Sequence, residues 1–170
     1  MSLSLIVVLV VVPAMMAYAA ASDLVTMTIP NWLCLSLVAA FGLCAAWTGF
    51  GWAASGWNLA AGLAVLAVCF GMFAAGWIGG GDAKLAAVTA LWLGFDQLLP
   101  YLFVASLAGG LLTVAILKLR SGPLPALASG WTWAQRLHDV KHGVPYGIAL
   151  ALGALVVLPD SAIWRVAIGA

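Results

Sequence analysis

The sequence contains no glutamate, and its 170 residues include only five aspartates and six lysines or arginines. Hydrophobic residues make up 66% of the chain. A soluble domain of this size could not cover so much apolar surface, so the composition is that of a membrane protein. A basic tail, a coiled-coil heptad and a low-complexity linker are also missing, which argues against nucleic-acid binding.

Cysteine is scarce as well. Cys34, Cys44 and Cys69 all lie inside apolar runs, and no Cys-x-x-Cys pair is present. We interpret the three as small hydrophobic core residues rather than as metal ligands or disulfide partners.

Long apolar runs are what the sequence has in abundance. A membrane-spanning helix needs about 20 apolar residues, and six candidate runs lie at residues 3–22, 32–50, 57–78, 83–95, 98–117 and 144–159. The fourth run gives only roughly 20 Å of helix. It can therefore cross only where the bilayer thins or where protein surrounds its ends. The first run has no preceding Lys or Arg, so we expect a retained span rather than a signal peptide.

One sizeable polar stretch, from Ser121 to Gly143, lies between the fifth and sixth runs. Its second half mixes tryptophan with cations, which is typical of a short helix at the headgroup level. The sequence therefore predicts an all-α polytopic membrane protein. We expect about six transmembrane helices, a short interfacial helix between the fifth and sixth, and a single domain over residues 1–170.

The basic residues predict the orientation. With six spans, one side of the membrane carries Lys84, Lys118, Arg120, Arg136 and Lys141. Only Arg165 falls on the other side. The positive-inside rule makes the first side cytoplasmic, with both termini outside. Asp23 and Asp82 then share the cytoplasmic face, although neither was used to choose it.

Asp82 follows three glycines at the polar start of the fourth run. Acidic groups at a bilayer boundary are costly, so they are rare and usually functional. Glycine allows backbone angles closed to other residues and the close approach of another chain, so we interpret Gly79 and Gly81 as backbone-positioning residues. A simple N-terminal cap of the fourth helix is the alternative role for Asp82. Lys84 either reaches to the headgroups or tunes Asp82.

Asp23 ends the first run, and Pro30 and Asn31 begin the second. Proline suits the entry to a helix and asparagine offers turn-forming hydrogen bonds, so we interpret both as positioning residues. The alternative role for Asp23 is that of a solvated residue in a short loop. Two carboxylates brought close cannot both ionise cheaply, so one keeps its proton and the other acts as a base. Such a pair can activate a water against a peptide carbonyl and then protonate the leaving amine.

A zinc site is the competing interpretation of the segment from His138 to His142, because two histidines four residues apart on a helix can bind one zinc ion. Asp139 stands where the metalloprotease motif has glutamate, and the chain has no third histidine to complete the site. We therefore predict no metal and no cofactor.

Two motifs in order, Asp23-x5-Ile29-Pro30-Asn31 and Gly79-x-Gly81-Asp82-x-Lys84-Leu85, resemble those of the type IV prepilin peptidases. These are polytopic membrane aspartic proteases with a Gly-x-Gly-Asp signature. The short chain and the run from Val144 to Ala149 are similar to the branch that serves Tad/Flp pili.

This resemblance implies a peptidase that removes the N-terminal leader from prepilin or pseudopilin precursors. The cut would lie at the cytoplasmic face of the bacterial inner membrane, with Asp23 and Asp82 as the catalytic pair. Larger members have an added cytoplasmic segment, often with paired Cys-x-x-Cys motifs, and also methylate the new amino terminus. This sequence shows neither the segment nor the motifs, so the resemblance does not extend to methyltransferase activity. A non-enzymatic assembly subunit, or a proton-coupled carrier using the same carboxylates, is the alternative.

Overall fold

The computed structural model describes residues 3–124 and 128–169, which fold into helices without any strand. The first helix runs without interruption from Leu3 to Thr26. It comprises α1 (Leu3–Ile6), the π-helical segment η1 (Val7–Val11) and α2 (Val12–Thr26). The helices that follow are α3 (Asn31–Thr48), α4 (Trp52–Ala74), α5 (Gly80–Leu93), α6 (Leu98–Arg120), α7 (Thr132–His138), α8 (Gly147–Val157), the 3-10 turn η2 (Leu158–Asp160) and α9 (Ala162–Ile168).

Four helices in the described part of the chain are long and apolar enough to cross a membrane, namely Leu3–Thr26, α3, α4 and α6. A fifth span results if Gly147–Asp160 and Ala162–Ile168, which meet at a bend of 57°, cross as one broken helix. The predicted all-α membrane fold is therefore confirmed, with four or five such helices against six apolar runs. The fourth run is counted in neither case, because it forms α5, which has only 14 residues. The sixth run is counted only if the broken helix crosses as one span.

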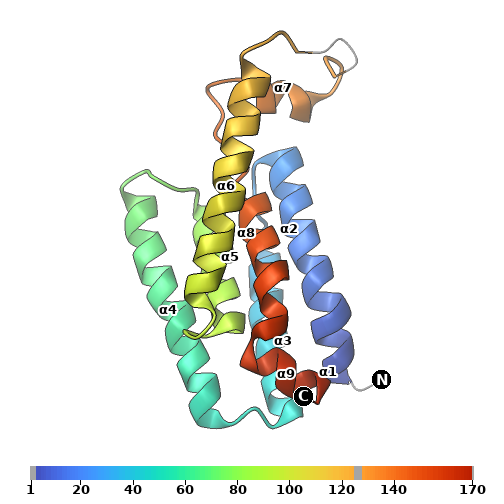
Figure 1. Cartoon of the computed structure of the whole chain (residues 1–170), viewed down its shortest axis with the longest axis vertical. Helices are drawn as coiled ribbons and strands as arrows, with labels where there is room; N and C mark the ends of the chain where they lie inside the picture. Colours follow the sequence, from blue (N-terminus) through green and yellow to red (C-terminus); the bar gives the residue numbers. More distant parts are fainter. Residues whose placement is uncertain (1–2, 125–127, 170) are drawn as a thin grey trace.

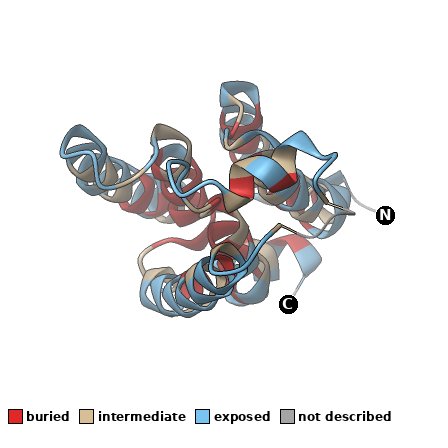
Figure 2. Ribbon diagram, turned by 90° about the horizontal axis from the view of Figure 1, so that it is seen from above, coloured by how far each residue is buried: buried red, intermediate tan, exposed pale blue. Residues whose placement is uncertain are grey.

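The short helix α5 is buried on all sides. Buried residues gather in the middle of the bundle and exposed residues on its outside (Figure 2), and every residue of α5 from Leu85 to Leu93 is buried. α4 packs closely on it, because a Cβ at Gly62 would lie only 3.1 Å from the Cβ of Leu91. The side chain of Asn58 also donates to the backbone oxygen of Leu91 at 3.0 Å. Since protein rather than lipid surrounds α5, its length need not match the bilayer.

The first helix is longer than the sequence predicted. The apolar run ends at residue 22, whereas the helix continues to Thr26. Met27 ends it in the left-handed conformation, with a φ of 55°. The amide of Met27 donates to the backbone oxygen of Asp23 at 2.8 Å, which closes the last turn. Asp23 therefore lies in a helical turn rather than in the loop that follows.

The predicted short helix between the fifth and sixth runs is present as α7. It lies at the end of the bundle where α2 ends and α5 begins (Figure 1). Arg136 on α7 donates to the backbone oxygen of Val25 at 3.2 Å. Arg120, the last residue of α6, donates to the backbone oxygens of Leu137, His142 and Gly143. These bonds fasten α7 and the loop after it to α2 and α6.

Candidate active site

Asp23 and Asp82 line the same cavity, although they come from different helices. The cavity has a volume of about 290 Å³. Its lining consists of Asp23, Met27, Thr28, Ile29, Gly79, Gly80, Gly81 and Asp82. The last turn of α2, the connection to α3 and the start of α5 thus form its wall. Two acidic side chains facing one small space is the arrangement that a carboxylate pair requires.

Asp23 is almost completely enclosed, with 6% of its surface exposed. The backbone amide of Gly147, the first residue of α8, donates to its Oδ2 at 2.7 Å. A carboxylate can be buried at a tolerable cost only if such donors replace the water it loses. Asp23 is therefore not the solvated loop residue of the alternative interpretation.

Asp82 is the third residue of α5, which begins at Gly80 after the N-cap residue Gly79. Its carboxylate accepts a hydrogen bond from the Gly79 backbone, as the third residue of a helix does in a capping box. Burial, followed by the nearby charge of Asp23, raises the pKa of Asp82 to about 7 despite that hydrogen bond. Asp82 thus helps to cap α5, and near neutral pH it also exchanges its proton readily.

The glycine run before Asp82 acts through close packing. None of its residues has a positive φ, so the expectation of backbone angles closed to other residues is wrong. Gly79 is extended, with φ −73° and ψ 145°, and the other two are helical. A Cβ at Gly81 would lie 3.2 Å from the Cβ of Ile29, and one at Gly79 would lie 3.2 Å from Oδ2 of Asp82. The missing side chains therefore let α5 begin against the connection between α2 and α3.

The other three residues interpreted as positioning residues do not line the cavity. Pro30 is the N-cap residue of α3, in keeping with its expected place at the entry to the second span. The Nζ of Lys84 donates to Oδ1 of Asn31 at 2.8 Å. Lys84 therefore turns towards α3 rather than towards Asp82. The bond between Lys84 and Asn31 ties the start of α3 to the start of α5.

The two histidines do not share a helix face. α7 ends at His138, and Asp139 has an extended backbone, so His142 is not on the same helix. The Nδ1 of His142 lies 3.2 Å from Oδ2 of Asp139, and both side chains are exposed. The described residues contain no cluster of three or more metal-ligating side chains. The geometry on which the zinc interpretation depends is therefore not formed.

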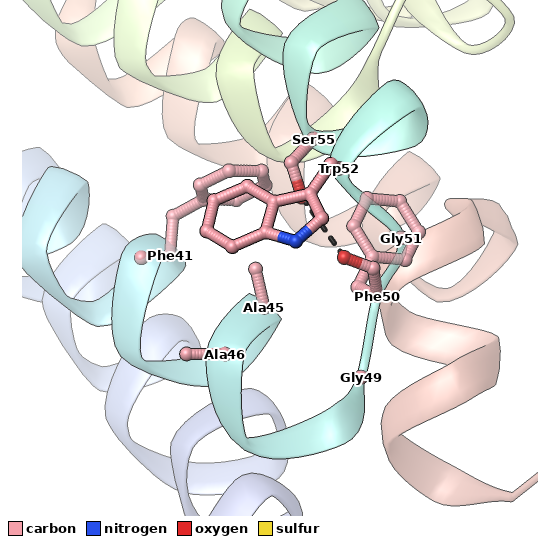
Figure 3. A pocket seen from close by; sticks show the side chains of 9 residues that line it. Phe41, Ala45, Ala46, Gly49, Phe50, Gly51, Trp52 and Ser55 are labelled. Carbon is pink, nitrogen blue, oxygen red and sulfur yellow. Dashed lines mark hydrogen bonds between the residues drawn. The ribbon is translucent and has the colours of Figure 1, made fainter.

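A larger cavity of about 400 Å³ lies at the turn between α3 and α4 (Figure 3). Its lining is mostly apolar and includes no ionisable side chain. The hydroxyl of Ser55 donates to the backbone oxygen of Phe50 at 3.1 Å. This turn is at the opposite end of the bundle from α7 (Figure 1). Of these two cavities, only the smaller one is lined by acidic side chains.

A comparison with protein families decides which class of membrane protein carries this cavity. The model of the type IV leader peptidase family matches residues 10–114, more than half of the chain. The chain belongs to this family. Its members are aspartic prepilin leader peptidases, so the protein is an aspartic-type endopeptidase. The matched range contains both Asp23 and Asp82. Neither the curated proteins nor the solved structures include a match to this chain.

Gly147 does not line the leader peptidase's cavity, but it binds a carboxylate that does, and the sequence did not indicate this role. In the sequence it is one residue of the run from Val144 to Ala149. Glycine has no side chain whose chemistry could point to a role, and its contribution here is a backbone amide. A Cβ at this position would lie 2.8 Å from Oδ2 of Asp23. The signal available in the sequence was the small residue at the start of an apolar helix.

Proposed function

We propose that Asp23 and Asp82 form the catalytic dyad of a leader peptidase for Flp-type prepilins. The observation that carries the proposal is the single cavity of about 290 Å³ that both carboxylates line. The family supplies the reaction, which is hydrolysis of the peptide bond between leader and mature pilin. The non-enzymatic alternative has no comparable support.

The environments of the two carboxylates suggest different roles for them. Asp23 is bonded to a backbone amide, which stabilises a negative charge. Asp82 has a pKa raised to about 7 by burial and by Asp23, so it is the member that retains a proton. Asp23 takes a proton from a water whose oxygen attacks the scissile carbonyl carbon. Asp82 gives its proton to the nitrogen of the scissile peptide bond. The C–N bond then breaks, and the amine leaves protonated.

The position of the cavity suits a substrate that is half in the membrane. A prepilin has an apolar helix in the bilayer and a polar leader outside it, so its scissile bond lies near the interface. Asp23 is in the last turn of a spanning helix, and Asp82 is in the first turn of α5. The positive-inside rule favours the cytoplasmic face of the inner membrane for this end. The run at residues 144–149 favours the Flp branch.

Cleavage of a Flp-type prepilin in membranes tests the dyad. We expect Asp23→Asn and Asp82→Asn each to reduce the rate by at least about a hundredfold, because each removes an acid–base group. Asp160→Asn is the matched control, since Asp160 forms an exposed ion pair with Arg165 in a different part of the chain. Precursor and mature pilin are separated by gel electrophoresis. Processing at the wild-type rate by either active-site variant would refute the proposal.

A further inference from the structure

The hydrogen bond that Asp23 receives comes from outside its own part of the sequence. Gly147 donates to Oδ2 of Asp23 across 124 residues. The described residues provide no hydrogen bond to Oδ1 of Asp23. The bond therefore fixes one carboxylate oxygen and leaves the other for a water molecule. Whatever holds Gly147 in place also determines where that free oxygen points.

The residue before Gly147 is held by a gap in α6. A Cβ at Gly109 would overlap the Cζ, Cε2 and hydroxyl oxygen of Tyr146. The ring of Tyr146 therefore lies directly on the backbone of α6, in space that only a glycine leaves open. The neighbouring Gly110 has no atom within 4 Å of the position that its Cβ would take. The need for glycine is thus specific to position 109.

α6 also holds the chain just before Tyr146. The Nη2 of Arg120 donates to the backbone oxygens of His142 and Gly143 at 3.0 and 2.9 Å. Pro145, between this anchor and Tyr146, is fully buried. Residues 142–147 are therefore fixed at two points on one helix, through Arg120 and through Gly109.

We propose that Gly109 and Tyr146 are positioning residues for Asp23, acting through the backbone amide of Gly147. The contact between ring and glycine sets the position of that amide, and the amide orients the carboxylate towards the attacking water. The inference rests on the proposed catalytic role of Asp23. It adds α6 and α8, neither of which lines the cavity, to the machinery of the reaction.

The test compares Gly109→Ala with Gly110→Ala in a prepilin cleavage assay. In Gly109→Ala the new methyl group displaces the Tyr146 ring and the Gly147 amide. We expect kcat to fall at least about tenfold with little change in KM, because misplacing a catalytic group by about 1 Å can cost up to a hundredfold. Gly110→Ala should keep wild-type values. Equal kinetics for the two variants, or a defect in KM alone, would overturn the proposal.

A double-mutant cycle separates positioning from a general loss of packing. Tyr146→Ala should lower kcat by itself, whereas Tyr146→Phe keeps the ring and should remain active. Adding Gly109→Ala to Tyr146→Ala should change kcat by less than about twofold, because the ring that the methyl group would meet is gone. Independent, multiplicative effects would contradict the mechanism. If Gly109→Ala alone does not insert, the contrast between Tyr146→Ala and Tyr146→Phe decides the question.

The same assay distinguishes two kinds of failure. Full activity of Asp23→Asn would remove the proposed dyad and this inference with it. If Asp23→Asn is inactive while Gly109→Ala and Tyr146→Ala cleave normally, the dyad stands and only the positioning role is lost.

Discussion

Asp82 occupies a site where ionisation is expensive. Its side chain is withdrawn from water and faces a second acidic group across the cavity, and both effects favour the protonated form. The start of α5 and the Gly79 backbone act in the opposite direction but do not outweigh them. A carboxyl group with a pKa of about 7 can give and take a proton at neutral pH.

This property predicts the pH dependence of cleavage. The pKa of Asp82 is raised from 3.8 to about 7, so the acid form is present below pH 7 and is lost as the pH rises through that value. We expect kcat at pH 8 to be about tenfold lower than at pH 6, the ratio of the protonated fractions. The measurement is kcat at saturating prepilin in proteoliposomes from pH 5 to 9. A rate that stays constant up to pH 9 would exclude Asp82 as the acid.

Individual helices were predictable because long apolar runs have few other solutions in a membrane. All six runs form helices, including the short run that became α5. Their ends were less predictable. The first helix continues for one more turn, to Thr26, and Met27 ends it in the left-handed conformation. No glycine or proline marks this end in the sequence, so the boundary was hard to predict. That turn carries Asp23, so a small error in a helix boundary changes the interpretation of a site residue.

The packing of α4 on α5 gives a prediction at the scale of these helices. Gly62→Leu should destabilise the protein by about 1–3 kcal/mol, because its side chain must enter a packed contact between two buried backbones. A Cβ at Gly62 would already lie 3.2 Å from the backbone oxygen of Ala87. Gly71→Leu on the same helix is the control, since a Cβ there meets nothing within 4 Å. Thermal unfolding in detergent measures both variants, and equal midpoints would contradict the packing argument.

At the scale of the whole molecule, the proposed active site is assembled from segments that are far apart in the sequence. The order of motifs suggested that Asp23 and Asp82 belong together, but no periodicity could show that they line one cavity. The contribution of Gly147 was harder still to foresee, because a backbone amide leaves no trace in the type of side chain. The sequence thus predicts which chemical groups are present, whereas the packing of α2, α5 and α8 determines their relative positions.

The distribution of charge over the molecule predicts its orientation. Three cations lie at the end of the bundle where α2 terminates (Figure 1). They are Lys84 near the start of α5, Arg120 at the end of α6 and Arg136 in α7. Arg165 lies in α9, at the other end of the bundle. Cytoplasmic loops carry the excess of basic residues in membrane proteins. We therefore expect the end with both aspartates to face the cytoplasm.

Labelling of single cysteines tests this orientation in intact cells. The three native cysteines are replaced by alanine, and Lys141→Cys and Asp160→Cys are introduced separately at exposed positions. A membrane-impermeant maleimide should label position 160 in intact cells, because that end faces outwards. It should reach position 141 only after the inner membrane is opened. Each variant is also labelled after solubilisation, which shows that its thiol is reactive. Labelling of position 141 but not 160 before lysis would reverse the orientation, and the aspartates would then lie on the wrong side to meet a leader in the cytoplasm.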